Sequence, residues 1–435
     1  MKWKTIAALG GVAVAAQASA LQPLDAFLRG ARKSSPDVAE SQAARREAGA
    51  EANAALGRAL PGLSLRGTYT RNQFESTLQL PGPAGAPPSA VTITPKDLLD
   101  GTATLDVPLV DLASFARIAS ARTSARASAS LEASTDLRVQ ALVAQDYYQL
   151  VANAALVVSS RQALDVARSS LRIAEQRHDA GTTTLLDVDR ARAEVERNVQ
   201  QLASAELDVS LVARALQSLT GIAPDLDGAT PLTDDLHEEA PLERFEAPDD
   251  QLPAIAAAIQ GRIASEQAAT AQRLALLPSL AASATERTTS VAGLTGRETY
   301  WQAVVGLTWT FDLTSLANIR ARDAAADGAR AREQRTRLAA RDDIHRAWQT
   351  VRTSIERSRS ARVQAEVSAR AARLALDRYQ AGTATQLDLL QAQRDAFQAD
   401  AARIQADADL VNARAQLRVA SGKDLLLEPR ASPAP

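Results

Sequence analysis

Residue types that carry catalysis or bind metals are few and scattered in this 435-residue chain. The chain contains no cysteine, and its three histidines, His178, His237 and His345, lie far apart in the sequence. It has neither a glycine-rich phosphate loop ending in lysine nor an H-E-x-x-H motif, the patterns that bring phosphate-binding or zinc-binding groups together. Without thiolates, neither disulfides nor cysteine-based zinc clusters can form. The sequence therefore predicts a protein that is not an enzyme and that needs no cofactor or metal.

One motif rich in polar side chains occurs twice. Residues 177–191 read RHDAGTTTLLDVDRA and residues 378–392 read RYQAGTATQLDLLQA, so both contain R-x-x-A-G-T-x-T-x-L-D. A glycine between two helical stretches suits the position just past a helix end, where φ is positive. The Thr-x-x-Asp that follows is typical of a capping box, which satisfies the first N–H groups of a new helix. Each copy therefore predicts a helix end, a tight turn and a second helix, with tips at residues 177–187 and 378–388.

These motifs belong to a longer internal repeat. The two halves share two glycine positions offset by 201 residues (382 − 181) and two proline positions offset by 217 (253 − 36). The corresponding pairs are Gly181 and Gly382, Gly221 and Gly422, Pro36 and Pro253, and Pro61 and Pro278. An irregular stretch rich in Pro and Gly, residues 75–100, accounts for the difference of 16 (217 − 201). We predict two repeats of one unit, residues 21–221 and 252–422.

The first twenty residues have the features of a cleaved signal peptide. Lysines at positions 2 and 4 precede an apolar run at residues 6–16, and Ala18 and Ala20 form an A-x-A cleavage site. An uncleaved membrane anchor is the alternative. The predicted mature chain, with net charge −4 once both lysines are lost (−2 − 2), leaves the cytoplasm and gives no indication of nucleic-acid binding.

Long helices dominate each predicted repeat. No proline occurs in residues 109–223 or 279–428, and no glycine occurs between residues 112 and 180. A helix of that length would measure about 100 Å, and the return helix about 55 Å. Apolar residues recur every seven positions, which is typical of coiled-coil packing. They are Leu150, Val157, Leu164 and Leu171, then Val188, Val195, Leu202, Val209 and Leu216, and in the second half Leu389, Leu410 and Leu417, where Arg403 interrupts the series.

Strands are predicted at about residues 63–74, 101–110, 279–291 and 300–311. Trp301, Val305 and Leu307 alternate with polar or small residues, a period of two with one apolar face. Such strands suit a transmembrane β-barrel, whose outer face meets lipid; a half-buried sheet in a soluble protein is the alternative. Four strands cannot close a barrel, since the smallest membrane barrels need about eight. A barrel would therefore be shared between chains.

The duplicated R-[HY]-x-A-G-T-x-T-x-L-D hairpin, the Leu-Pro before the first strand of each half and the helix-strand-strand-helix-helix order resemble the TolC-like outer-membrane efflux proteins (outer membrane factors). This resemblance covers nearly the whole mature chain. It implies a mainly α fold with a small β part and two tandem repeats. It also implies a homotrimer, in which three times four strands form a 12-stranded outer-membrane β-barrel continued by a periplasmic α-helical barrel.

The resemblance also implies roles for the hairpin tips. In the family the tips receive the adaptor protein, and acidic residues of the return helices narrow the pore entrance. Carried over, the adaptor-docking tip consists of Arg177, Gly181, Thr182, Arg378, Tyr379, Gly382 and Thr383. The pore constriction consists of Asp187 and Asp388, with Arg190 and Gln391 three residues beyond them. Structural capping alone is the alternative role for the aspartates, and Arg190 could pair with Asp187 or Asp189 and lock a closed tip.

Residues 222–251 differ from both repeats. They contain ten acidic residues, one arginine and four prolines. This composition predicts a linker between the two repeats and not a further long helix. The resemblance implies that they help form a belt around the middle of the tunnel; a solvated linker is the alternative. Residues 423–435 are a C-terminal tail.

The function implied is a passive exit duct of a tripartite efflux system that conducts small molecules to the exterior. Its partners would be a periplasmic adaptor, an inner-membrane pump of the resistance-nodulation-division or ABC type, and outer-membrane lipid. The duct would lie in the outer membrane and extend into the periplasm. Type I protein secretion is the alternative within this class, and a secreted coiled-coil adhesin is the alternative outside it.

Overall fold

A computed structural model of the protein describes residues 21–80, 89–226, 232–246, 248–293 and 296–427. The predicted signal peptide, the centre of the stretch rich in Pro and Gly, and residues 428–435 of the predicted tail lie outside the described residues. Among the described residues, no helix is both long and apolar enough to cross a membrane.

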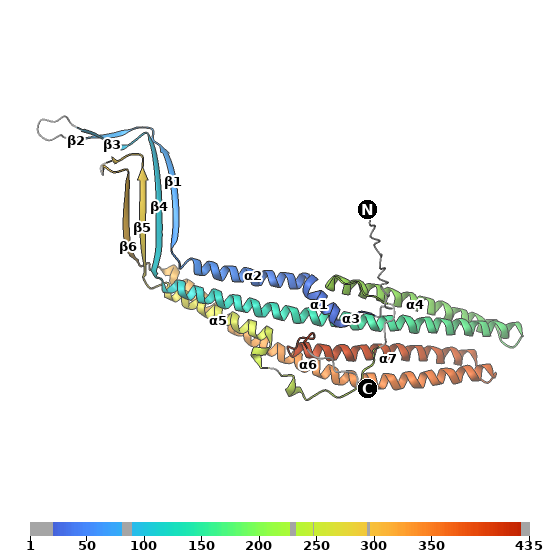
Figure 1. Ribbon diagram of the computed structural model, residues 1–435. Helices are drawn as coiled ribbons and strands as arrows, with labels where there is room; N and C mark the ends of the chain where they lie inside the picture. Colours follow the sequence, from blue (N-terminus) through green and yellow to red (C-terminus); the bar gives the residue numbers. More distant parts are fainter. Residues whose placement is uncertain (1–20, 81–88, 227–231, 247, 294–295, 428–435) are drawn as a thin grey trace, which may run out of the picture. The chain divides into compact units, whose positions relative to one another are not determined.

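The chain is mainly helical, with a small β part, as the sequence predicts (Figure 1). The first half contains α1 (Leu24–Ser34), α2 (Pro36–Gly57), β1 (Gly62–Arg71), β2 (Ser76–Leu80), β3 (Ser89–Thr94), β4 (Asp97–Val110), α3 (Leu112–Asp179) and α4 (Leu185–Thr220). The second half contains the short 3-10 turns η1 (Leu242–Arg244) and η2 (Asp249–Gln251), then α5 (Pro253–Leu274), β5 (Ser279–Thr289), β6 (Thr299–Thr308), α6 (Leu313–Gln380) and α7 (Gln386–Ala420). The second half follows the helix-strand-strand-helix-helix order, and the first half follows it too apart from the additional helix α1 and hairpin β2–β3.

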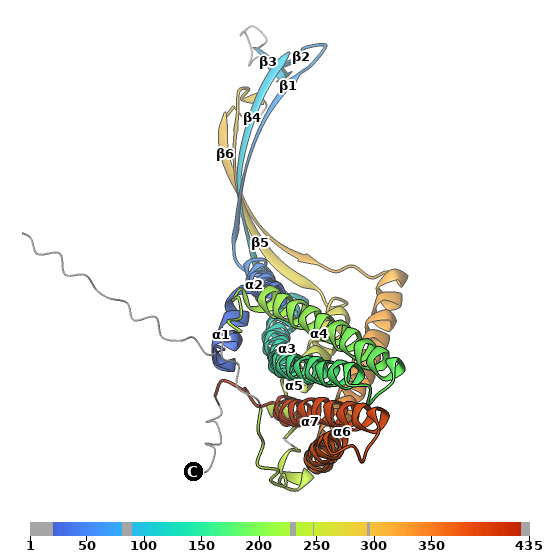
Figure 2. The ribbon, with the colours of Figure 1, turned by 90° about the vertical axis from the view of Figure 1, so that its right-hand side faces the viewer.

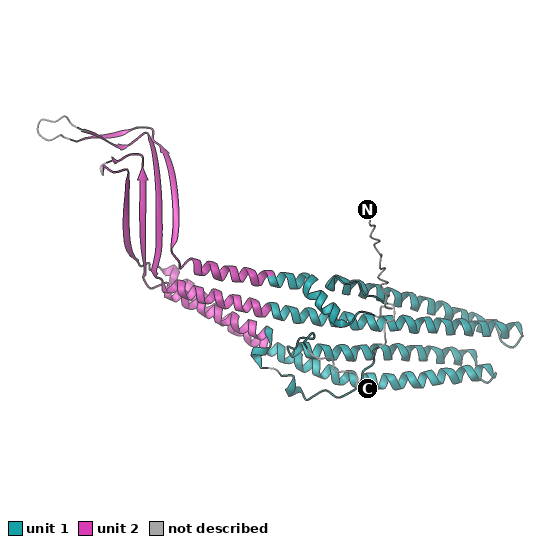
Figure 3. Cartoon of the chain, viewed as in Figure 1, with its two compact units in different colours: residues 1–42, 132–253, 338–435 teal, residues 43–131, 254–337 magenta. Residues whose placement is uncertain are grey.

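The chain forms two compact units, and neither coincides with a sequence repeat (Figure 3). Unit 1 comprises Met1–Gln42, Glu132–Pro253 and Leu338–Pro435, and unit 2 comprises Ala43–Leu131 and Ala254–Arg337. Each unit therefore combines segments of both halves. The long helices α3 and α6 each contribute one part to unit 2 and the other part to unit 1.

Unit 2 contains an antiparallel sheet with strand order β1-β4-β5-β6, which can be followed in Figure 1; Figure 2 shows the same sheet turned by 90°. Strands β4 and β5, from different halves, pair over ten residues each, with Leu105 opposite Ala284. The register shifts between Pro108 and Val110, because proline has no N–H to donate to the ladder. The edge strands β1 and β6 each have one neighbour in the described chain. The sheet is thus open at both edges.

The sheet carries one apolar and one polar face, and the apolar face is exposed. Leu65 is 76% exposed, Trp301 78% and Leu307 70%. On the other face Thr104 and Thr285 lie 3.1 Å apart through their hydroxyls, and Arg287 forms an ion pair with Asp100. An exposed apolar surface of this kind indicates contact with lipid or with another chain.

The strands differ from the sequence expectation at their ends. β1 and β6 end earlier than predicted, so that Trp309 and Phe311 follow β6 and lie outside the strand. The stretch predicted to be irregular contains a separate antiparallel hairpin, β2–β3, and the start of β4. Short polar strands beside a segment rich in Pro and Gly carry no clear period of two, so sequence pattern alone does not separate them from a loop.

The helices of unit 1 bury part of the seven-residue series that the sequence predicts, whereas Leu171, Val195, Leu202 and Val209 are only half-buried. Leu150, Leu389, Leu410 and Leu417 are fully buried, whereas Arg403 is half-buried. An additional helix, α1, packs Phe27 and Leu28 into a core with residues of α3 and α4. The sequence pattern does not predict α1, because Pro36 marks a helix start and the apolar face before it spans only a few turns.

The acidic linker belongs to unit 1, and its residues 234–240 contact the helices of that unit. Arg414 of α7, only 6% exposed at its side chain, forms ion pairs with Asp234 (3.0 Å) and Glu239 (2.5 Å). The same guanidinium donates to the backbone oxygen of His237 at 2.8 Å. The indole N–H of Trp348 on α6 donates to the backbone oxygen of Ala240. These residues of the linker are therefore held against the helices of unit 1.

Candidate functional site

The two hairpin tips reverse the chain with the same turn. Gly181 and Gly382 follow α3 and α6 with φ of +74° and +77°. The Gly181 N–H donates to His178 and the Thr182 N–H donates to Arg177, both at 2.8 Å. This pair of bonds is a Schellman motif, which satisfies the last carbonyls of the helix and requires a left-handed residue at the glycine position. The second tip repeats it with bonds from Gly382 and Thr383.

The helix starts after the two turns differ, although the sequence predicts a capping box in both. At the second tip the Thr385 hydroxyl accepts from the Asp388 N–H, and the Asp388 carboxylate accepts from the Thr385 N–H, which completes the box. At the first tip Thr184 makes no side-chain cap, and its hydroxyl donates to the Asp187 carboxylate at 2.9 Å. The Asp187 carboxylate also accepts from the Thr183 hydroxyl, so these donors converge on the acid and the hydroxyl does not cap the helix.

The two aspartates have different surroundings. Asp187 is half-buried; burial raises the pKa of its carboxyl, but hydrogen bonds from Thr183 and Thr184 and the charge of Arg190 outweigh this and hold the pKa below its usual value. Asp388 is exposed, and the hydroxyl and backbone bonds from Thr385 lower its pKa. Both carboxylates are therefore ionised at neutral pH.

The residues three positions further on also differ. Arg190 lies 3.5 Å from the Asp187 carboxylate, so the pairing considered from the sequence is present. Gln391 makes no such contact with Asp388 and donates to Asp395 at 2.9 Å. Arg190 therefore partly neutralises the Asp187 carboxylate at the first tip. Gln391 does not neutralise Asp388 at the second tip.

Tyr379, one of the residues predicted for the docking surface, is buried in its tip. Its side chain is 3% exposed, and the Arg177 guanidinium lies 4.5 Å from the centroid of its ring. Its hydroxyl has no hydrogen-bond partner among the described residues. The ring thus contacts the tip surface through Arg177, which covers it.

The other predicted docking residues remain accessible in the chain. Gly181, Thr182, Arg378, Gly382 and Thr383 are exposed. Arg177 is half-buried because it covers Tyr379. The structure thus brings the two tips together through a contact between α3 and α6. The spacing of the repeats in the sequence does not predict this contact.

Polar links between α4 and α7 were missed by the sequence analysis. Glu194 is 5% exposed and accepts from Arg394 at 2.5 Å and from Arg197 at 3.2 Å. A signal was available, since Glu194 and Asn198 share the buried face of α4 with Ala191. A buried acid requires a partner of opposite charge, but its identity depends on α7, 200 residues away.

One group of described residues has the spacing of metal ligands. Asp234, Asp235 and His237 place one ligand atom each within 4.8 Å of one another. Arg414 already binds Asp234 and lies 2.9 Å from Nε2 of His237. A guanidinium at that position opposes a second cation, so the group acts as the anchor of the linker.

Comparison with known proteins agrees with this architecture. The profile of the family described as outer membrane efflux protein matches residues 27–222 and 250–423. No curated protein matches the chain significantly.

Several solved structures share the fold. The outer-membrane channel OprN has a TM-score of 0.78 at 22% identity, covering 92% of this chain and 90% of that chain. The Campylobacter jejuni CmeC outer membrane channel has a TM-score of 0.80 at 19% identity, covering 94% of this chain and 88% of that chain. The outer membrane protein VceC of Vibrio cholerae has a TM-score of 0.77 at 19% identity, covering 92% of this chain and 96% of that chain.

Proposed function

Because this chain belongs to the outer membrane efflux protein family, we propose that it is the exit duct of a tripartite efflux system. In this proposal it conducts small molecules passively from an inner-membrane pump and a periplasmic adaptor to the exterior. Its sheet lies in the outer membrane and its helices extend into the periplasm, after a signal peptide has directed export.

The observation that carries the proposal is the open sheet of unit 2. Its apolar face is exposed along β1 and β6, and both edge strands lack a second neighbour in the described chain. Unpaired strand edges are unfavourable in lipid, because the backbone groups there have no water to bond. Three copies of the chain joined edge to edge would supply twelve strands, enough for a closed barrel. We therefore propose a homotrimer.

The hairpin tips supply the second part of the proposal. The exposed residues Gly181, Thr182, Arg378, Gly382 and Thr383 form the surface that receives the adaptor. Asp187 and Asp388 from three chains would place six carboxylates at the entrance, a field that favours cations. Arg190 reduces this field at the first tip of each chain, given its 3.5 Å contact with Asp187.

A matched pair of substitutions tests the membrane assignment. Leu65 lies on the apolar face of β1, and its neighbour Ser64 lies on the opposite, polar face. Leu65→Arg should prevent trimers from accumulating in the outer membrane, because an arginine facing mid-membrane lipid costs about 2–4 kcal/mol. Ser64→Arg should leave heat-modifiable trimers that still conduct in planar bilayers. Equal tolerance of both substitutions would show that this face does not meet lipid.

A further inference from the structure

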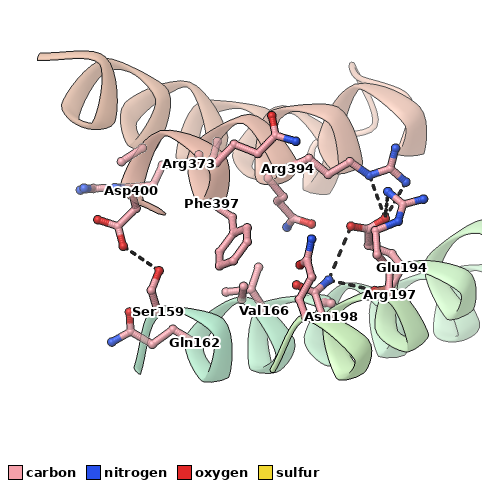
Figure 4. A pocket seen from close by; sticks show the side chains of 18 residues that line it. Ser159, Gln162, Val166, Glu194, Arg197, Asn198, Arg373, Arg394, Phe397 and Asp400 are labelled. Atoms are coloured by element: carbon pink, nitrogen blue, oxygen red, sulfur yellow. Dashed lines mark hydrogen bonds and ion pairs between the residues drawn. The ribbon is translucent and has the colours of Figure 1, made fainter. Parts of the chain in front are cut away.

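A cavity of about 460 Å³ lies inside unit 1, between the α3–α4 hairpin and the α6–α7 hairpin (Figure 4). All four helices contribute to its wall. Its volume is within the range of sites that bind drug-sized molecules, about 300–1,000 Å³. The cavity is separate from the tip residues described above, none of which lines it.

The middle of the cavity is apolar and contains one aromatic ring. Phe397 points from α7 into the space between the hairpins, with Val166 of α3 across from it (Figure 4). Alanines make up most of the remaining apolar wall: Ala163, Ala167, Ala369, Ala372 and Ala396. Small side chains leave the space unfilled, so a flat apolar body fits against the half-buried Phe397 ring.

The carboxylates at the cavity wall already have partners. Glu194 accepts from both Arg394 and Arg197. Asp400 accepts from the Ser159 hydroxyl at 2.6 Å and from Arg403 at 2.7 Å. A cationic ligand would have to displace one of these partners, and the site therefore does not favour cations.

The groups without partners are a guanidinium and several amides. Arg373 of α6 has no ion pair or hydrogen bond among the described residues, and the same holds for the side-chain amides of Gln162, Gln201 and Gln398. The charge left available at the wall is thus positive. Neutral amides can in addition bond an oxygen of either ligand or water.

We propose that this cavity binds an amphipathic organic anion, an aromatic carboxylate whose ring system stacks on Phe397 and whose carboxylate pairs with Arg373. Because four helices line the cavity, the bound molecule contacts both hairpins at once. It therefore favours the arrangement in which the hairpins have the separation seen here, since a ligand stabilises the state that it binds. The proposal does not rest on the proposed function, because binding is a property of the purified chain.

Binding of naphthoate to the purified full-length protein tests the proposal, with its uncharged methyl ester as the comparison probe. Calorimetry should show saturable binding of naphthoate and much weaker binding of the ester. Arg373→Gln should weaken naphthoate binding by about tenfold, the loss expected for one charge-assisted bond, without changing binding of the ester. Phe397→Ala should weaken binding of both probes.

The control variant is Arg370→Gln, which removes an arginine of α6 that pairs with Glu366 and does not line the cavity. This variant should bind as the parent does. Ala372→Leu, which fills the cavity without removing a polar group, should abolish binding while the protein melts as the parent does. If naphthoate does not bind the parent, or binds equally to the parent, Arg373→Gln and Ala372→Leu, the cavity is not the site and the proposal is wrong. Equal binding of ester and acid to the parent would refute the assigned charge.

Discussion

The Arg177 guanidinium at the end of α3 lies 4.5 Å from the centroid of the Tyr379 ring at the end of α6. This contact joins two turns that are 201 residues apart in the sequence (382 − 181). The ring is 3% exposed, so the contact is largely shielded from water. Cation–π contacts are strongest when they are shielded in this way. The contact therefore links the ends of α3 and α6 within one chain.

The contact between Arg177 and Tyr379 should contribute measurably to the stability of the tips. Arg177→Gln should destabilise the packing of the two tips by about 1–2 kcal/mol, because Arg177 is half-buried and cation–π pairs contribute about 0.5–1 kcal/mol when exposed and about 2 kcal/mol when desolvated. Hydrogen exchange at residues 180–184 and 381–385 should then accelerate, while exchange in the middle of α3 stays unchanged. A double-mutant cycle with Tyr379→Leu isolates the pair; additive effects would mean that the two side chains do not interact.

The backbone conformation at Gly382 should limit which residues this position can accept. Its φ is +77°, and an added Cβ would lie 3.8 Å from the Arg177 guanidinium, an ordinary contact. Any penalty is therefore from the backbone: Gly382→Val should cost about 1–2 kcal/mol, whereas asparagine tolerates this region better. Trimers should persist in Gly382→Val while export falls, and Gly382→Asn should retain more export. Gly49→Ala, in the interior of α2 with open space around it, is the control, and equal export by all three variants would leave the turn without a functional role.

The two helix starts should respond differently to the same change. Thr385→Val removes a complete capping box and should cost about 1 kcal/mol. Thr184→Val should cost less, because the Thr184 hydroxyl does not accept from the backbone of α4. Thermal unfolding of the two variants measures the difference. A larger loss for Thr184→Val would contradict the caps described here.

Ion selectivity should change only in acid. The pKa values of Asp187 and Asp388 lie below the ordinary value of 3.8, so both carboxylates stay charged from neutral pH down to about pH 4. The stability that their hydrogen bonds give is present above the unfolded-state pKa and is lost as pH falls through the lower folded-state pKa. Cation preference in planar bilayers should follow the same course, constant at pH 5–7 and declining below about pH 4.

Charge substitutions identify the groups behind that selectivity. The double variant Asp187→Asn, Asp388→Asn should show weaker cation preference and no decline in acid, with only a small loss of thermal stability because the asparagine side-chain oxygen can still accept from Thr184 and Thr385. Arg190→Gln should strengthen cation preference, since it frees Asp187 of its 3.5 Å partner. Unaltered selectivity in both would place the gate elsewhere and leave the aspartates as caps.

Removing Arg414 should release the acidic linker. Arg414→Met leaves the carboxylates of Asp234 and Glu239, which are 10% and 13% exposed, without their cation. Breaking a buried pair in this way costs about 3–5 kcal/mol, so residues 232–246 should become sensitive to limited proteolysis. Arg346→Met, which removes an exposed arginine paired with Asp343, should leave the digestion pattern of the parent. Continued protection in Arg414→Met would mean that other contacts hold the linker.

The sequence by itself determined the order of the long helices and of the four main strands, together with the geometry of the turns, but it did not show α1 or the hairpin β2–β3. The absence of proline and glycine from residues 112–180 predicts α3, which spans Leu112–Asp179. Gly181 and Gly382 predict the positive φ that both turns adopt. These features follow from rules that act within a few residues, namely backbone sterics, helix periodicity and the preference of glycine for left-handed turns. The duplication then supports each reading with a second copy.

Only the tertiary structure decided which residues meet. The burial of Tyr379 beneath Arg177, the partner of Glu194 on α7 and the anchoring of the linker by Arg414 all join positions that are far apart in the chain. The compact units likewise combine segments of both repeats. Local sequence rules cannot predict these pairings, because residues that are buried together are neighbours in space and not in the sequence. A charged residue at a position expected to be buried shows only that it needs a partner. The identity of that partner depends on how the helices of the two halves pack.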